Sequence, residues 1–218
     1  MTSTSLDKDH AQRMDRKYRW TRHVYDLTRK HFLLGRDVGL ANLHLKAGMH
    51  ALEIGCGTGR NIRSMLKEHP GVRVDGIDIS QRMLETAQAR FQGDERVRLA
   101  LADAQDTQFR QRLGEPVNYD AVLMSFSLSM VPQWEGAFEN ALRAVKLGGR
   151  LSVVDFGRFE GYGAMGKAAI RSLTAHDAPP LLGLEEKARQ LARAHPSWRV
   201  RWQSLHRGYA QTLVIQPR

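Results

Sequence analysis

Cysteine is nearly absent from this sequence of 218 residues, which contains Cys56 alone. A single cysteine excludes an internal disulfide and a cysteine-based metal cluster, and it fits a reducing compartment. The nine histidines show no H-E-x-x-H or similar ligand spacing, so we predict no metal site. Because no histidine stands beside Cys56, we expect a structural thiol in place of a nucleophile.

Long apolar runs are also missing. The longest candidate, residues 121–131, is shorter than the ~18 residues of a membrane-spanning helix, and we expect a strand there. The segment from Thr2 to Lys17 is polar and charged, unlike a signal peptide with its apolar centre. We therefore expect a cytoplasmic protein that is soluble or peripherally associated with a membrane.

Charge is distributed unevenly along the chain. The net charge is +10, yet residues 37–157 hold fourteen Lys and Arg against fifteen Asp and Glu. Residues 1–36 hold nine against four, and residues 158–218 hold ten against four. Basic ends favour an anionic partner, either nucleic acid or an anionic membrane surface. The alternative is a charged surface that serves solubility alone.

Segments with strand character alternate with segments of helical character. The expected strands are residues 52–54, 72–79, 97–101, 119–126, 150–156, 198–205 and 209–215. The expected helices are residues 61–69, Ser80 (as N-cap) to about 91, 134–145, 168–173 and 184–194, with one or two amphipathic helices within 9–34. A turn is expected at 147–149 and a glycine-containing loop at 157–164. This order predicts a single α/β domain with a seven-stranded, mostly parallel sheet that ends in an antiparallel hairpin.

Three glycines stand between the first expected strand and helix. Gly55, Gly57 and Gly59 allow a tight turn and let a ligand approach the backbone at the start of a helix. A dinucleotide-binding G-x-G-x-x-G motif would place its third glycine at position 60, which is Arg60. The spacing is therefore G-x-G-x-G, preceded by Glu53.

The stretch from Leu52 to Gly59 resembles the first motif of the class I S-adenosylmethionine-dependent methyltransferases. The resemblance extends over residues 50–156 and implies a Rossmann-like fold, S-adenosylmethionine as cofactor and S-adenosylhomocysteine as product. By the same resemblance, Asp78 takes the ribose hydroxyls and Asp103 the adenine amino group, although either carboxylate would equally suit a helix cap. The predicted cofactor-binding residues are Tyr25, Arg36, Glu53, Gly55, Cys56, Gly57, Thr58, Gly59, Asp78, Ile79, Met83, Asp103, Ala104 and Ser125.

Two further stretches resemble the N-methyltransferases of bacterial betaine-lipid synthesis, namely residues 18–37 and residues 127–134. This resemblance implies successive methylation of diacylglyceryl-homoserine to diacylglyceryl-trimethylhomoserine. It also implies a lipid substrate at an anionic membrane surface, with the enzyme that makes diacylglyceryl-homoserine as a second partner. Trp20 and Phe32, interleaved with basic residues, suit adsorption on such a surface, although they equally suit packing over the cofactor pocket.

The predicted reaction is direct in-line displacement by an acceptor amine, with orientation as the main contribution of the enzyme. The predicted catalytic residues are Tyr18, His23, Tyr25, Ser127 and Met130. We expect residues 1–36 to form a basic helical lid or membrane-contact segment and residues 37–218 to form the methyltransferase domain. The alternative acceptor is a small molecule, such as a quinone precursor or another amine. RNA is a weaker alternative because no Asn-Pro-Pro-Tyr-type motif follows the fourth strand, and we expect no nucleic-acid partner. A non-catalytic cofactor-binding subunit is the third possibility, and the complete glycine motif argues against it.

Overall fold

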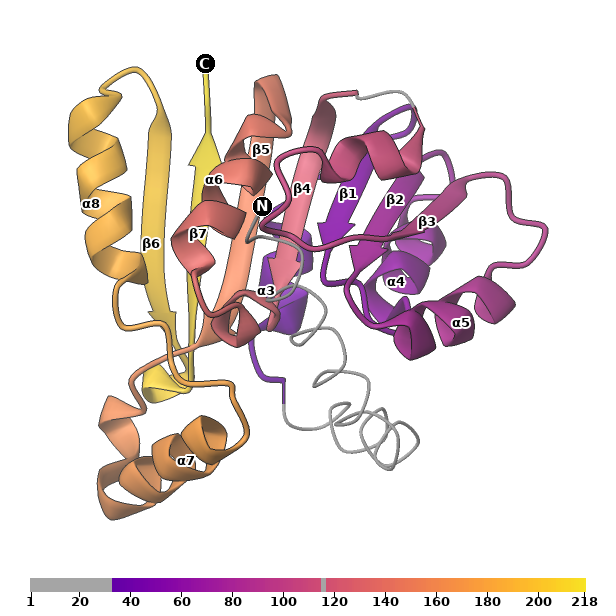
Figure 1. The fold of residues 1–218 in the computed structure, drawn as a ribbon. Helices are drawn as coiled ribbons and strands as arrows, with labels where there is room; N and C mark the ends of the chain where they lie inside the picture. Colours follow the sequence, from indigo (N-terminus) through magenta and orange to yellow (C-terminus); the bar gives the residue numbers. More distant parts are fainter. Residues whose placement is uncertain (1–32, 115–116) are drawn as a thin grey trace, which may run out of the picture.

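The computed structural model describes residues 33–114 and 117–218 of the protein. At its centre is a seven-stranded sheet in the order β3-β2-β1-β4-β5-β7-β6 (Figure 1). The strands are β1 (His50–Ile54), β2 (Arg73–Asp78), β3 (Val97–Leu101), β4 (Tyr119–Ser125), β5 (Val145–Phe156), β6 (Arg199–Leu205) and β7 (Ala210–Gln216). Strands β1 to β5 run parallel, and β7 is antiparallel to both β5 and β6. The predicted sheet with its terminal hairpin is confirmed.

Helices cover both faces of the sheet. They are α3 (Arg36–Ala41), α4 (Arg60–Glu68), α5 (Gln81–Arg90), α6 (Trp134–Arg143), α7 (Gly163–Ala175) and α8 (Leu184–Ala194). Short 3₁₀ turns lie at η1 (Phe109–Leu113), η2 (Leu128–Met130), η3 (Glu160–Tyr162) and η4 (His206–Gly208). Figure 1 shows α7 beyond the end of β5, apart from the helices that flank the strands.

Neighbouring strand residues supply two separate cores because their side chains point to opposite faces. Leu52 packs with Phe138 of α6 and Leu184 of α8 on one face. Ala51, the preceding residue, packs with Ile62 of α4 and Leu84 of α5 on the other. A sheet that is buried on both faces explains the nearly continuous apolar character of β1 and β4.

Two predicted elements have boundaries that differ from the structure by more than two residues. β5 begins at Val145, so the turn expected at 147–149 is an irregular stretch within the strand, where the pairing with β4 shifts register between Tyr119 and Ala121. Helix α7 is longer than the expected 168–173, although it contains Gly166. A Cβ at Gly166 would lie 2.7 Å from the carbonyl oxygen of Phe159, so close packing compensates for the low helix propensity of glycine there.

Register brings the ends of the central strands to one edge. Ile54 pairs with Ile77 and Met124, and Asp78 pairs with Leu101. The loops that follow β1, β2, β3 and β4 therefore emerge side by side, at the carboxyl ends where α/β folds bind ligands.

Candidate cofactor and acceptor site

The loop after β1 depends on its glycines for two different reasons. Gly55, Gly57 and Gly59 have φ values of 75°, 54° and 76°, a left-handed conformation that side chains disfavour. A Cβ at Gly55 would lie 2.4 Å from the Cβ of Ser127, so this glycine is required by packing. A Cβ at Gly57 would meet no atom within 4 Å. Gly57 therefore presents bare backbone to open space, as a ligand-binding turn requires.

Glu53, the next-to-last residue of β1, is a buried carboxyl group. It is 1% exposed, and one oxygen accepts a hydrogen bond of 2.6 Å from the amide of Asn61. Its other oxygen, Oε2, has no hydrogen-bond partner among the described residues. Burial raises the pKa of Glu53 to about 8, with Asp78 acting in the same direction, while the bond from Asn61 and the charge of Arg36 oppose the shift. The ionised form of such a carboxyl group is stabilised when a cation or a hydrogen-bond donor contacts its second oxygen.

Asp78 ends β2 and holds the glycine loop. Its Oδ2 accepts a hydrogen bond of 2.7 Å from the N–H of Gly57, and its Oδ1 accepts one of 2.9 Å from the N–H of Ser80. Ser80 in turn caps α5, where its hydroxyl accepts from the N–H of Met83, as predicted. Each carboxylate oxygen has a second lone pair, so these bonds are compatible with the predicted binding of ribose hydroxyls.

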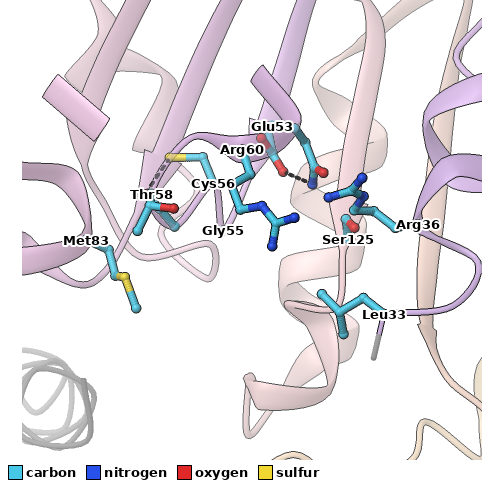
Figure 2. Close-up of a pocket in the computed structure, with 11 residues that line it drawn as sticks. Leu33, Arg36, Glu53, Gly55, Cys56, Thr58, Arg60, Met83 and Ser125 are labelled. Carbon is cyan, nitrogen blue, oxygen red and sulfur yellow. Dashed lines mark hydrogen bonds between the residues drawn. The ribbon is translucent and has the colours of Figure 1, made fainter. Parts of the chain in front are cut away.

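A pocket opens beside the glycine loop (Figure 2). Figure 2 shows the guanidinium of Arg36 extending from the start of α3 toward Glu53 and Ser125. The Ser125 hydroxyl is buried and has no hydrogen-bond partner among the described residues. The lining brings together residues from α3, β1, α4, α5 and β4, namely Leu33, Arg36, Glu53, Gly55, Cys56, Gly57, Thr58, Arg60, Asn61, Met83 and Ser125. Eight of the predicted cofactor-binding residues are therefore in one place.

Three apolar candidates also meet at this edge. Met83 is buried, and Ile79 and Met130 pack against it. Met130 comes from η2, which follows β4, so it connects the predicted acceptor side with the cofactor side. Asp103 and Ala104 follow β3 and are not part of the pocket lining. Asp103 Oδ1 accepts from the N–H of Gln105 at 2.8 Å, and its buried Oδ2 has no hydrogen-bond partner in the part of the chain that the structure describes.

Ser127 makes a structural contact at the glycine loop. Its hydroxyl donates a hydrogen bond of 2.9 Å to the carbonyl of Ile54, and its side chain fills the space that Gly55 leaves. Its predicted catalytic role therefore lacks support in this geometry, and it stays a prediction. The other catalytic candidates, Tyr18, His23 and Tyr25, lie outside the described residues.

Cys56 lies in the loop with its thiol buried. Burial raises the pKa of this thiol well above its usual value, and the nearby carboxyl groups of Asp78 and Glu53 act in the same direction. A thiol with a raised pKa is a poor nucleophile, in line with the structural role that we predict.

Sequence reasoning missed three pocket residues, Leu33, Arg60 and Asn61. Arg60 and Asn61 open α4 directly after the last glycine, and this position beside a ligand-binding turn was a usable signal. The pairing of Asn61 with Glu53 depends on how one helical turn is placed against β1, which the sequence does not show. Leu33 belongs to the apolar residues at the end of the N-terminal segment, for which the sequence allows either a membrane contact or packing over the cofactor pocket.

Comparison with known proteins finds sequences similar to the central part of this chain. Residues 52–151 match the family described as "Methyltransferase domain". A stretch of 114 residues is 36% identical to a demethylmenaquinone methyltransferase of Tropheryma whipplei, covering 52% of this chain and 44% of that protein. A stretch of 120 residues is 34% identical to phosphoethanolamine N-methyltransferase 2 of Caenorhabditis elegans, covering 54% of this chain and 26% of that protein. The chain thus spans less than half the length of these curated relatives.

Solved structures share the fold over nearly the whole chain. The plantazolicin methyltransferase BpumL in complex with SAH superposes with a TM-score of 0.69 over 98% of this chain and all of that one, at 12% identity. Phosphoethanolamine N-methyltransferase 2 of Haemonchus contortus, with phosphomonomethylethanolamine and S-adenosylhomocysteine, gives a TM-score of 0.63 over 84% of this chain and 53% of that one, at 19% identity. At these identities the likeness concerns the fold alone.

Proposed function

We propose that the class I S-adenosylmethionine-dependent methyltransferase domain of this chain transfers a methyl group to a small-molecule amine. The observation that carries the proposal is the glycine loop, where the open backbone of Gly57 lies next to a buried, incompletely bonded Glu53. The family matched by residues 52–151 gives the reaction class. The more specific part of the proposal is that the acceptor is an amine.

The pocket residues fit S-adenosylmethionine. Its amino-acid end carries an ammonium group, which suits Glu53 Oε2, and a carboxylate, which suits Arg36 and Arg60 at the same pocket. Asp78 ends β2, and we assign it to the ribose hydroxyls. Met83 and Ile79 offer an apolar surface for the adenine ring. The site therefore offers opposite charges to the amino-acid end of the cofactor, a carboxylate to its ribose and an apolar surface to its adenine ring.

The chemistry needs little from the protein beyond placement. Bound S-adenosylmethionine supplies an electrophilic methyl group on a sulfonium sulfur. With the cofactor held by Glu53 and Arg36, the chain would only have to hold an acceptor amine in line with that methyl, so that an N–C bond could replace the C–S bond while the amine proton passed to solvent. Ser125 ends β4 and lines the pocket, and Met130 in η2 packs against Met83, so we assign both to orienting the acceptor. An amine with a pKa near 8 requires no strong dedicated base.

Two independent features favour an amine acceptor. One curated relative is a phosphoethanolamine N-methyltransferase. Residues 18–37 and 127–134 resemble amine-methylating enzymes, and Met130 of the second stretch packs against Met83, which lines the pocket. A quinone precursor is the alternative small molecule, supported by the similarity to demethylmenaquinone methyltransferases.

A lipid-linked amine, diacylglyceryl-homoserine, is the second candidate within the same chemistry. The sequence stretches at 18–37 and 127–134 favour it, whereas the relatives reported above fit a small molecule better. No helix within residues 33–114 and 117–218 is long and apolar enough to cross a membrane. A lipid acceptor would therefore require the described domain to work at the membrane surface.

The test is a panel of acceptors with the full chain and labelled S-adenosylmethionine. Phosphoethanolamine, a soluble demethylated naphthoquinone and diacylglyceryl-homoserine in vesicles are offered separately, and products are identified by mass spectrometry. We expect label on a nitrogen. Label on a quinone carbon would overturn the amine assignment, and label on the lipid with neither small molecule methylated would favour the second candidate.

A further inference from the structure

Five basic side chains gather at the end of the sheet opposite the glycine loop. Arg150 stands early in β5, and Arg199 and Arg201 lie at the start of β6. His44 and Lys46 are exposed in the connection between α3 and β1. We call these five residues the basic cluster. The parallel strands run away from this end, so the cofactor pocket opens elsewhere.

The three arginines share one face of the sheet. Ser152 donates a hydrogen bond to the carbonyl of Gly39 in α3, so Arg150, two residues earlier, is on the α3 face as well. Arg201 reaches Asn42, which follows α3, and Arg199 is two residues from Arg201. Register places Arg199 and Arg201 about two strand spacings, or roughly 10 Å, from Arg150 across β7.

A single buried residue holds two of these arginines. Asn42 is 7% exposed, and its backbone carbonyl accepts a hydrogen bond of 3.2 Å from Arg150. Its side-chain oxygen accepts one of 3.0 Å from Arg201, while its amide nitrogen lies 3.4 Å from the hydroxyl of Thr212. The two guanidinium groups are therefore fixed near each other by an uncharged partner.

No carboxylate balances this charge among the described residues, since no ion pair there includes any member of the basic cluster. Burial lowers the pKa of Arg150, and the charges of Arg199 and Arg201 lower it further. Burial also lowers the pKa of His44, as do Arg150, Arg201 and Lys46. Capping of the carboxyl end of α3 explains the hydrogen bond from Arg150 to Asn42. It does not explain why Arg199 and Lys46 are also basic at this end of the sheet.

We propose that the basic cluster is a binding site for an anion that carries more than one phosphate group, separate from the methyl-transfer site. Planar guanidinium groups bind phosphate oxygens in pairs, and here two of them are already oriented by Asn42 before any ligand arrives. The spread of the cations across β5 and β6 suits a ligand larger than a single phosphate. The proposal does not depend on the nature of the methyl acceptor.

The test compares binding of pyrophosphate and inorganic phosphate to the full chain and to two variants at constant ionic strength. Arg150→Gln with Arg201→Gln removes the pair held by Asn42, and Lys46→Gln with Arg199→Gln removes two exposed cations that hold no hydrogen bond in the described structure. The matched control, Arg112→Gln with Arg193→Gln, removes the same charge elsewhere. We expect at least tenfold weaker pyrophosphate binding in the first variant and a smaller loss in the second. Affinity in the control should stay within twofold of the wild type.

Unchanged S-adenosylmethionine binding shows that each variant is folded. If the first variant does not fold, the second still decides the matter, because its side chains support no described contact. Equal pyrophosphate affinity in the wild type, the second variant and the control overturns the proposal. The same proteins are then tested on phosphatidylcholine vesicles with and without phosphatidylglycerol. Vesicle binding that the variants lose identifies lipid headgroups as the source of the phosphate, and soluble binding alone identifies a free compound.

Discussion

Two carboxyl groups, Glu53 and Asp75, are each 1% exposed and lie on neighbouring strands, yet their surroundings differ. Asp75 in β2 accepts two hydrogen bonds from Arg98, at 3.0 and 2.7 Å, and one from the hydroxyl of Tyr119 at 2.9 Å. The ring nitrogen Nε2 of His50 lies 3.1 Å from it as well. Glu53 accepts a hydrogen bond from the Asn61 side chain and is also stabilised by the backbone N–H of Ile62, but no cationic group lies against its second oxygen among the described residues.

The pKa values of Asp75 and Glu53 are shifted in opposite directions for this reason. Burial opposes ionisation of Asp75, but the contacts with His50, Arg98 and Tyr119 outweigh it and hold the pKa of Asp75 below its usual value. Burial of Glu53 is not compensated, and its pKa rises to about 8. A fully bonded buried carboxylate serves stability, whereas an incompletely bonded one at a pocket is available for a ligand.

Removal of the Asp75 carboxylate should have the largest effect on stability. Asp75→Ala leaves Arg98 without its partner and Tyr119 without its acceptor, so we expect a loss of about 3–5 kcal/mol in the free energy of unfolding. Urea unfolding measures it. S-adenosylmethionine affinity of the folded fraction should change little, and a large loss of affinity with unchanged stability would reverse the assigned roles.

Asp78 tests the cofactor side. Asp78→Ala removes the proposed acceptor for the ribose hydroxyls and the bond that positions Gly57. We expect at least a tenfold loss of S-adenosylmethionine affinity, or about 1.4 kcal/mol. Isothermal titration calorimetry measures it, and unchanged affinity in a folded variant would contradict the role.

Glu53→Gln should weaken S-adenosylmethionine binding without lowering the stability of the fold. The amide keeps the shape of the side chain and a neutral hydrogen bond but loses the charge opposite the cofactor ammonium. Because charged hydrogen bonds exceed neutral ones by about 1 kcal/mol, we expect roughly fivefold weaker S-adenosylmethionine binding. Stability at pH 9 should rise, since a buried charge is removed. A variant that loses stability at pH 9 without losing affinity would show that Glu53 behaves as Asp75 does.

The two carboxyls should also give opposite pH dependence. The folded-state pKa of Glu53 lies above its unfolded value of 4.5, so its contribution to stability is complete below pH 4.5 and is lost as pH rises toward 8. Asp75, with its lowered pKa, contributes above its unfolded value of 3.8 and loses that contribution as pH falls through the folded value. Urea unfolding from pH 5 to 9 should show a decline in the wild type that Glu53→Gln reduces.

A smaller effect accompanies cofactor binding. At pH 7 Glu53 is mostly protonated in the free protein, and an ammonium group at Oε2 favours the ionised form. Binding should therefore release part of one proton at pH 7, seen by calorimetry as an enthalpy that varies with the ionisation enthalpy of the buffer. Glu53→Gln serves as the control, and equal release from the variant would assign the proton to another group.

Much of this molecule follows from local sequence. Alternating strands and helices predicted the sheet and its hairpin, and the glycine spacing with Glu53 and Asp78 predicted the cofactor edge. These features are local because strand alternation, helix caps and glycine turns depend on neighbouring residues. The extent of α7 and the irregular stretch in β5 were not predictable. Gly166 in α7 packs closely on the backbone of Phe159 in the preceding loop, and Gly149 in β5 packs on the backbone of Tyr119 and Asp120 in β4.

Tertiary structure alone decided what each buried charge does. In the sequence, Glu53 and Asp75 are both acidic residues in apolar strands. The adjoining glycine motif marks Glu53 as a candidate for cofactor binding, but nothing local shows which partners either carboxyl group has. Arg98 and Tyr119 reach Asp75 from 23 and 44 residues away, and Arg150 and Arg201 meet at Asn42 across more than a hundred positions. Such partners are set by strand register and layer packing, because hydrogen bonds and charges act over a few ångströms in space and not along the chain.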